Sequence, residues 1–140
     1  MRNTKRILLF AGIVLALIVI IYRFASQTKT PILSTQTNTE GEVTVEVTPK
    51  DLANNSASWD FALSLQTHAI DLDQDLAKSS ILIDDNGNQF TPLAWEGDPP
   101  GGHHRQGLLR FAALQGQPAS IVLSIKNIGD VPERLFKWEF

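Results

Sequence analysis

Residues 43–140 of this chain are predicted to fold as an all-β domain, an antiparallel two-sheet sandwich of about seven strands. Three observations support this fold class. Hydrophobic residues recur with a period of two in most segments, short polar stretches rich in Gly, Asn, Asp and Pro separate them, and hardly any helical period is present. This combination is typical of two packed antiparallel sheets rather than of a helical or mixed fold.

The alternation is clearest in the first two predicted strands. In VTVEVT (43–48) the three valines share one face and the polar residues the other, and Pro49 is expected to end this strand. In WDFALSLQT (59–67) four large hydrophobic residues from Trp59 to Leu65 alternate with smaller or polar ones. Each segment therefore predicts a strand with one face buried.

The later elements are shorter. SSILIDDNGNQFTPL (79–93) predicts two strands joined by a turn at 85–88, because Asn-Gly readily supplies the positive φ angles of a tight hairpin. The acidic segment 70–80 is the one place where a short helical turn is predicted. Further strands are predicted in GLLRFAAL (107–114), SIVLSIKNI (120–128) and ERLFKWEF (133–140).

An apolar block at residues 7–22 predicts a transmembrane helix before this domain. It holds no charged side chain and would span roughly 24 Å as a helix, which Arg23 can lengthen by snorkelling. We assign residues 1–25 to the anchor, with membrane contact through residues 7–24. A cleaved signal peptide is the alternative, although the bulky residues 22–24 fit a cleavage site poorly.

Basic residues around this block set the expected orientation. Arg2, Lys5 and Arg6 precede it, and Arg23 and Lys29 follow it closely. The positive-inside rule then places the N-terminus in the cytoplasm and the C-terminal domain outside, as in a single-pass membrane protein. Residues 26–42, rich in Ser, Thr and Gln, predict a flexible linker that would reach on the order of 20 to 25 Å.

Composition excludes several classes of function. The chain has no cysteine, which rules out disulfides, thiol catalysis and thiolate metal sites. After residue 25 there are fifteen acidic and eight basic residues, so nucleic acid is not an expected partner of this acidic domain. Catalysis is not expected either, because Gly-x-Ser-x-Gly, His-Glu-x-x-His and phosphate-binding loop motifs are absent from the sequence.

The segment WEGDPPGGHHR (95–105) is the strongest candidate for a site. Imidazole binds Zn(II) and Cu(II), and a site usually needs three or four ligands that often include carboxylates. One arrangement at the end of the sandwich would bring the following residues together as ligands: His68, Asp71, Asp73, His103 and His104. The alternative is structural, with the histidines and Arg105 bonding loop carbonyls or nearby carboxylates.

Three residues of the same segment form a candidate loop for an organic or protein ligand. Trp95 could stack on a sugar or peptide, or plug the end of the sandwich. Arg105 and the neighbouring histidines could bind a carboxylate or phosphate of a partner through hydrogen bonds, with Asp98 beside them. The sequence leaves these roles open.

The strand count and alternation resemble an immunoglobulin-like sandwich, although the buried cysteine pair of antibody domains is absent. WEGDPPGGHHRQGLLRF together with THAIDLDQDL is also similar to a combination found in uncharacterised exported or membrane-anchored immunoglobulin-like domains. This resemblance covers most of residues 43–140 and implies an architecture without an activity.

The expected function is accordingly that of a membrane-anchored, extracytoplasmic module that binds or builds the cell envelope. Its partner would be an envelope protein or a glycan, and no cofactor is expected. The alternative function is an extracytoplasmic protein that binds Zn(II) or Cu(II) through His68 and the loop with His103 and His104.

Overall fold

The computed structural model describes residues 33–140, which we call the folded unit. The predicted membrane anchor, its alternative as a signal peptide, and the first part of the predicted linker lie outside the described residues. Within residues 33–140, no helix has the length and apolar character needed to cross a membrane.

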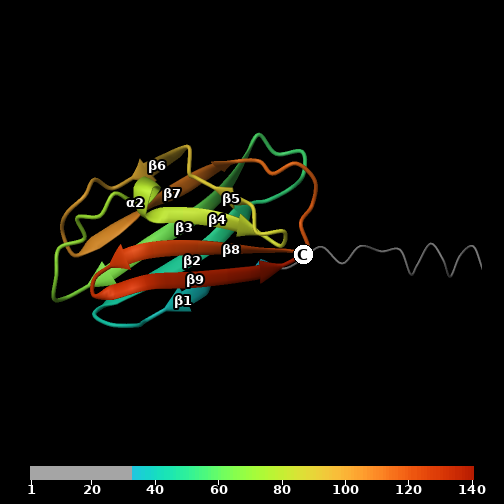
Figure 1. Cartoon of the computed structure of the whole chain (residues 1–140). Coiled ribbons are helices and arrows are strands. Elements are labelled where there is room, and N and C mark those ends of the chain that lie inside the picture. Colours follow the sequence, from blue (N-terminus) through green and yellow to red (C-terminus); the bar gives the residue numbers. More distant parts are fainter. Residues whose placement is uncertain (1–32) are drawn as a thin grey trace, which may run out of the picture. The chain divides into compact units, whose positions relative to one another are not determined.

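Two antiparallel sheets, which we call sheet A and sheet B, make up this unit, and in Figure 1 sheet B lies in front of β2 and β3 of sheet A. A short helix, α2 (Leu76–Ser79), precedes the first strand of sheet B and confirms the predicted helical turn. Sheet A has the order β1 (Gln36–Asn38), β2 (Val43–Asp51), β3 (Ser58–Thr67), β7 (His104–Ala112) and β6 (Ala94–Gly97). Sheet B has the order β5 (Gln89–Phe90), β4 (Ser80–Asp84), β8 (Ser120–Ile128) and β9 (Val131–Glu139).

The inner faces of both sheets share one hydrophobic core, as the alternation predicted. Phe61 of sheet A lies edge-on to Phe111 with ring centroids 5.7 Å apart, and 5.6 Å from the ring of Trp138 in sheet B. These aromatic side chains are almost fully buried. Burial of each contributes roughly 2 to 3 kcal/mol, so the contacts between the sheets stabilise the sandwich-like arrangement.

The prediction that Pro49 ends the first strand is wrong. β2 continues to Asp51, and its register against β3 shifts between Pro49 and Asp51. β1 pairs with β2 only as far as Val47, so Pro49 lies where one side of β2 has no strand beside it. A proline is tolerated at such a position because its missing N–H breaks no ladder.

Strand β1 lies within the predicted linker, so the folded unit starts earlier than residue 43. Its Gln36 side-chain amide donates to the carbonyl of Lys137 and accepts from the N–H of Lys137. The indole N–H of Trp138 donates to the carbonyl of Ser34 at 2.8 Å. These bonds cover part of the outer edge of β9, which would otherwise be open to pairing with another strand.

Arg134, on the inner face of β9, adds further hydrogen bonds on the same side of the molecule. Its side chain is 1% exposed and donates to the side chain of Asn38 and to the carbonyls of Glu40 and Ile128. Burial lowers the pKa of Arg134, and the nearby charge of Glu40 opposes that shift. The guanidinium therefore ties the turn after β1 to sheet B.

The loops gather at two ends of the described unit. At one end the C-terminus lies beside the loop after β7, where Phe140 donates its N–H to the carbonyl of Ala119 (Figure 1). Ser34, near the start of the described chain, contacts Trp138 close to this end. At the other end Thr67 donates its N–H to the carbonyl of His103. The predicted site is therefore at the end opposite the C-terminus.

Candidate functional site

The segment between β6 and β7 is fixed by backbone hydrogen bonds to the segment that follows β3. Leu72 donates to the carbonyl of Gly102 at 2.9 Å and accepts from the N–H of Gly101 at 2.8 Å. Gly101 and Gly102 have φ angles of 111° and 73°, in a region that side chains other than glycine rarely adopt. The two glycines thus let the loop turn back and lie along residues 67–72.

Arg105 is the central residue of this corner. Only 1% of it is exposed, and its guanidinium donates to the carbonyls of Leu72 at 3.0 Å, Gln74 at 2.7 Å and Asp98 at 3.3 Å. Burial lowers the pKa of Arg105, and the charges of Asp98 and two nearby aspartates oppose the shift. An arginine remains protonated under such a shift, so a charged group holds three segments together.

Trp95 packs against Arg105, with the guanidinium carbon 5.6 Å from the ring centroid. Its indole N–H donates to the carbonyl of Asp98 at 2.9 Å, so that carbonyl accepts from both side chains. Gly97 and Gly107 face each other across β6 and β7, and a Cβ on either would lie under 3.0 Å from the Trp95 ring. The ring therefore lies close over a pair of glycines.

The structure brings the predicted ligand loop together as an internally bonded corner. Trp95 and Arg105 meet the same carbonyl of Asp98, and the Asp98 carboxylate accepts from the N–H of Gln106 at 2.9 Å. The guanidinium of Arg105 donates its hydrogen bonds to backbone carbonyls, as the structural interpretation of this segment predicted. The hydrogen bonds of these three residues therefore hold the corner together.

The three histidines are exposed, and two of them come near each other. The rings of His68 and His104 are 6.4 Å apart between centroids, in an edge-to-face arrangement. Leu72 is fully buried, so Asp71 and Asp73 on either side of it are exposed to solvent.

No group of three His, Asp or Glu side chains that could hold a metal ion is present in residues 33–140. The predicted ligand set His68, Asp71, Asp73, His103 and His104 is therefore not assembled as a centre. His104 is the first residue of β7 and His103 lies in the bend before it, and only the rings of His68 and His104 come near each other.

Replacement of the histidines is expected to leave stability nearly unchanged. The His68→Ala/His103→Ala/His104→Ala variant should lose less than about 0.5 kcal/mol of unfolding free energy, because the three side chains are exposed. Thermal unfolding of the chelator-treated chain with and without Zn(II), Cu(II) or Ni(II) checks this result. A metal-dependent rise in midpoint that disappears in the triple variant would instead establish a metal site.

A trough runs over the solvent face of sheet A. Its floor is formed by small residues of the central strand β3, and one part of it has a volume of about 350 Å³. An adjoining hollow of about 170 Å³ shares Ser64 and Gln106 with the first and continues towards His104. We call this feature the sheet A trough, and its side chains are Glu46, Thr48, Ala62, Ser64, Gln66, Asp98, His104, Gln106 and Leu108.

Several side chains of the sheet A trough are polar. Ser64, Gln66, His104 and Gln106 line the two hollows, and all of them except the half-buried Ser64 are exposed. Glu46 adds an exposed carboxylate. The trough therefore offers hydroxyl, amide and imidazole groups of both donor and acceptor type.

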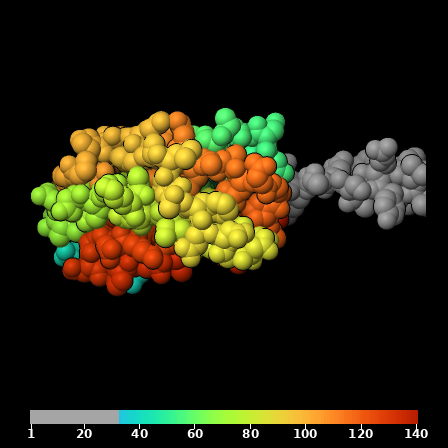
Figure 2. All heavy atoms as spheres, turned by 45° about the horizontal axis from the view of Figure 1, so that its top comes forward, coloured from blue at the N-terminus to red at the C-terminus, as the bar shows by residue number. Residues whose placement is uncertain are grey.

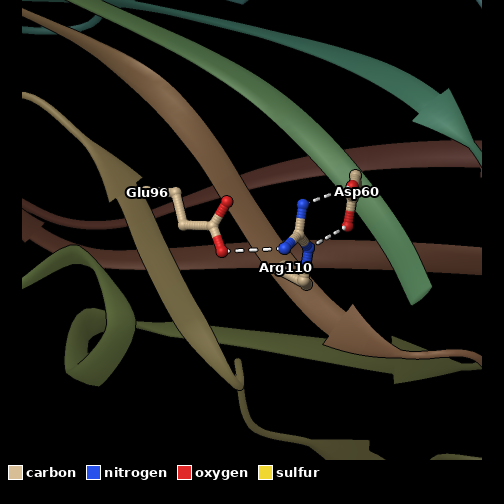
Figure 3. A network of polar contacts seen from close by, with 3 residues as sticks. All are labelled: Asp60, Glu96 and Arg110. Atoms are coloured by element: carbon tan, nitrogen blue, oxygen red, sulfur yellow. Dashed lines mark hydrogen bonds and ion pairs between the residues drawn. The ribbon is translucent and has the colours of Figure 1, made fainter. Parts of the chain in front are cut away.

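An ion network stiffens the sheet beyond Leu108 (Figure 3). Arg110 bonds both carboxylate oxygens of Asp60, at 3.1 and 3.2 Å, and one oxygen of Glu96 at 2.7 Å. The hydrogen bonds to Asp60 raise the pKa of Arg110. Because the three residues stand on β7, β3 and β6, the network ties the short edge strand β6 into the sheet.

A second hollow lies at the other end, between the β4–β5 hairpin and the loop after β7. Its volume is about 550 Å³, and Figure 2 shows the two segments, yellow and orange, side by side. The hairpin is held by Asp84, whose carboxylate accepts from the side chain of Asn88 and from the N–H groups of Asn86 and Asn88. These bonds, led by that of the Asn88 side chain, lower the pKa of Asp84.

Neither the trough nor this hollow was predicted from the sequence, because each joins segments that are distant along the chain. Comparison with known proteins adds no candidate, since no protein-family model, curated protein or solved structure matches the chain. The functional argument therefore rests on the geometry of the described residues.

Proposed function

We propose that this chain is a membrane-anchored, extracytoplasmic immunoglobulin-like domain that binds a protein of the cell envelope through the sheet A trough. The strand order supports the immunoglobulin-like topology. In that topology strands A-B-E-D form one sheet and C-F-G the other. Here β2-β3-β7-β6 and β4-β8-β9 follow the same two orders, with β5 and β1 added at the edges.

The observation that carries the binding proposal is the set of polar side chains over a floor of small residues. Ala62 and Ser64 leave room above β3, while Gln66, His104 and Gln106 extend beside them. A partner's backbone or polar side chains would find donors and acceptors there. The proposed role is binding, without catalysis.

A protein partner is favoured over a glycan by the position of the tryptophans. Sugars are commonly held against exposed aromatic rings. Trp59 and Trp138 are buried in the core, and Trp95 is held over the glycine pair on the inner side of sheet A. The side chains of the sheet A trough include no aromatic ring other than the imidazole of His104.

The proposed anchor is compatible with this use of the domain. Residues 7–22 supply an apolar span, and the described chain begins at the end of the sandwich that also holds the C-terminus. The sheet A trough lies on β2, β3 and β7, and residues 33–35 are not among those that line it. The surplus of acidic residues also disfavours adsorption of the domain to anionic headgroups.

Filling the trough should weaken partner binding while the domain stays folded. In the full chain displayed on cells, a photo-crosslinking residue at Gln106 is expected to capture one discrete envelope protein. Ser64→Arg should weaken that interaction at least about tenfold, because the new side chain occupies the floor of the trough. Ser120→Arg, on sheet B, is the matched control and should leave the crosslink unchanged.

Two results would overturn this assignment. One is equal capture with the crosslinker at Gln106 and at exposed Lys126 of sheet B, which would mean contact without a specific site. The other is retention of the full chain on purified envelope polysaccharide that Ser64→Arg abolishes, which would identify a glycan as the ligand. Circular dichroism of each variant confirms that the domain is folded.

A further inference from the structure

The solvent face of sheet B carries four hydrophobic side chains that lie next to one another. In the strand register Ile83 is opposite Val122, while Ile81 and Leu135 flank Ser124 from either side. Leu135 is 58% exposed, one of two large hydrophobic residues so exposed in residues 33–140. We call Ile81, Ile83, Val122 and Leu135 the sheet B patch.

A buried serine, Ser124, lies at the centre of the sheet B patch. Ser124 stands between Ile81 and Leu135, and it is 1% exposed although its side chain faces away from the core. Its hydroxyl is bonded to the carboxylate of Glu133 at 2.6 Å. A partner would therefore meet four hydrophobic side chains around a hydroxyl that Glu133 already satisfies.

Charges on β9 indicate what covers this patch. Along the solvent face of β9, Glu133 precedes Leu135 by two residues and Lys137 follows it by two, each roughly 7 Å away. A two-fold axis that passes near Leu135, lies in the plane of the interface and runs perpendicular to β9 would set the two β9 strands antiparallel. Glu133 of each copy would then face Lys137 of the other, so that the surface is complementary to itself.

We propose that the sheet B patch is the interface between two copies of this chain, packed face to face about a two-fold axis near Leu135. Edge-to-edge pairing of β9 is disfavoured, because Gln36 already bonds the backbone of Lys137 on that edge. Lys137 now pairs with Glu139 at 3.1 Å, but both side chains are largely exposed. Such a surface pair is exchanged for a new one at little cost.

The charge pattern provides a test that separates this interface from any other contact. Glu133→Lys and Lys137→Glu should each weaken self-association at least about tenfold, since each variant places like charges against one another in both contacts. An equimolar mixture of the two variants should recover most of the lost association, because the mixed pair regains opposite charges, although Glu133→Lys still lacks the acceptor of the Ser124 hydroxyl. Sedimentation velocity of the full chain in a density-matched detergent measures all three samples.

A hydrophobic control uses the two exposed leucines. Leu135→Asp should weaken association at least about tenfold, whereas Leu93→Asp, at a similarly exposed position before β6, should leave it unchanged. A monomeric original chain would overturn the proposal. So would association that persists in every variant, as expected for contacts through residues 7–24, or a mixture of charge variants that fails to associate.

Discussion

Arg105→Met is expected to lower the free energy of unfolding by on the order of 3 kcal/mol. The guanidinium donates to the carbonyls of Leu72, Gln74 and Asp98, and each hydrogen bond from a charged donor contributes about 1.5 to 3 kcal/mol. The carbonyls of Leu72 and Asp98 keep one other donor each, so the net loss is smaller than the sum. Urea denaturation of the full chain, followed by tryptophan fluorescence, measures it.

Arg105→Lys should recover less than half of this loss, because an ammonium group lacks the planar fork that reaches three acceptors. Lys126→Met is the matched control, since it removes an exposed cation, and it should change stability by less than about 0.5 kcal/mol. The loss in Arg105→Met should not vary between pH 5 and pH 9, because arginine stays protonated there although burial lowers its pKa. Equal losses in Arg105→Met and Lys126→Met would contradict this role.

The two buried arginines have corresponding roles in a domain that has no cysteine. Arg105 projects from the inner face of sheet A and holds the segments around Leu72 and Asp98. Arg134 projects from the inner face of sheet B and holds Asn38 with the turn after it. Each binds mainly carbonyl groups, so neither depends on a buried carboxylate that acid could neutralise. Hydrogen bonds from these side chains cross-link loops that are far apart in sequence.

The fold could be predicted to the extent that each strand carries its own pattern. Alternation is strong in residues 59–67 and 120–128, and the structure confirms strands there as β3 and β8. β1 and β6 were not predicted, because three or four residues of mixed polarity give no period. Their conformation depends on pairing with β2 and β7, which no local pattern specifies.

The site was less predictable because strand phase decides which side chains face inward. β7 begins at His104 rather than at the predicted Gly107, and this places His104 on the solvent face and Arg105 in the interior. Gly101 and Gly102 interrupt any periodicity that would have fixed the phase from the sequence. The sheet A trough needs the register of β2, β3 and β7 as well, and that register is a property of the folded sheet.

Gly107→Ala is expected to destabilise the domain by about 3 kcal/mol, although it adds only one methyl group. A Cβ at this position would lie 2.5 Å from Cα of Gly97 and 2.6 Å from the carbonyl oxygen of Glu96. Both contacts are with backbone atoms, so β6 must move and no side chain can relieve the strain by rotating. Thermal unfolding of the full chain, with tryptophan emission recorded, measures the change.

Gly87→Ala separates this steric effect from the general cost of replacing a glycine. Gly87 has a φ of 81° in the β4–β5 turn with open space around it, so its replacement should cost only about 1 kcal/mol of backbone strain. Gly107→Ala should also shift tryptophan emission, since the new methyl would lie 2.9 Å from the ring of Trp95 and displace it from Arg105. Equal losses in the two variants would show that β6 is held loosely. A larger loss with the emission shift would mean that the glycine pair, the Trp95 ring and the Arg105 guanidinium form one packed unit, on which the position of the loop before β7 depends.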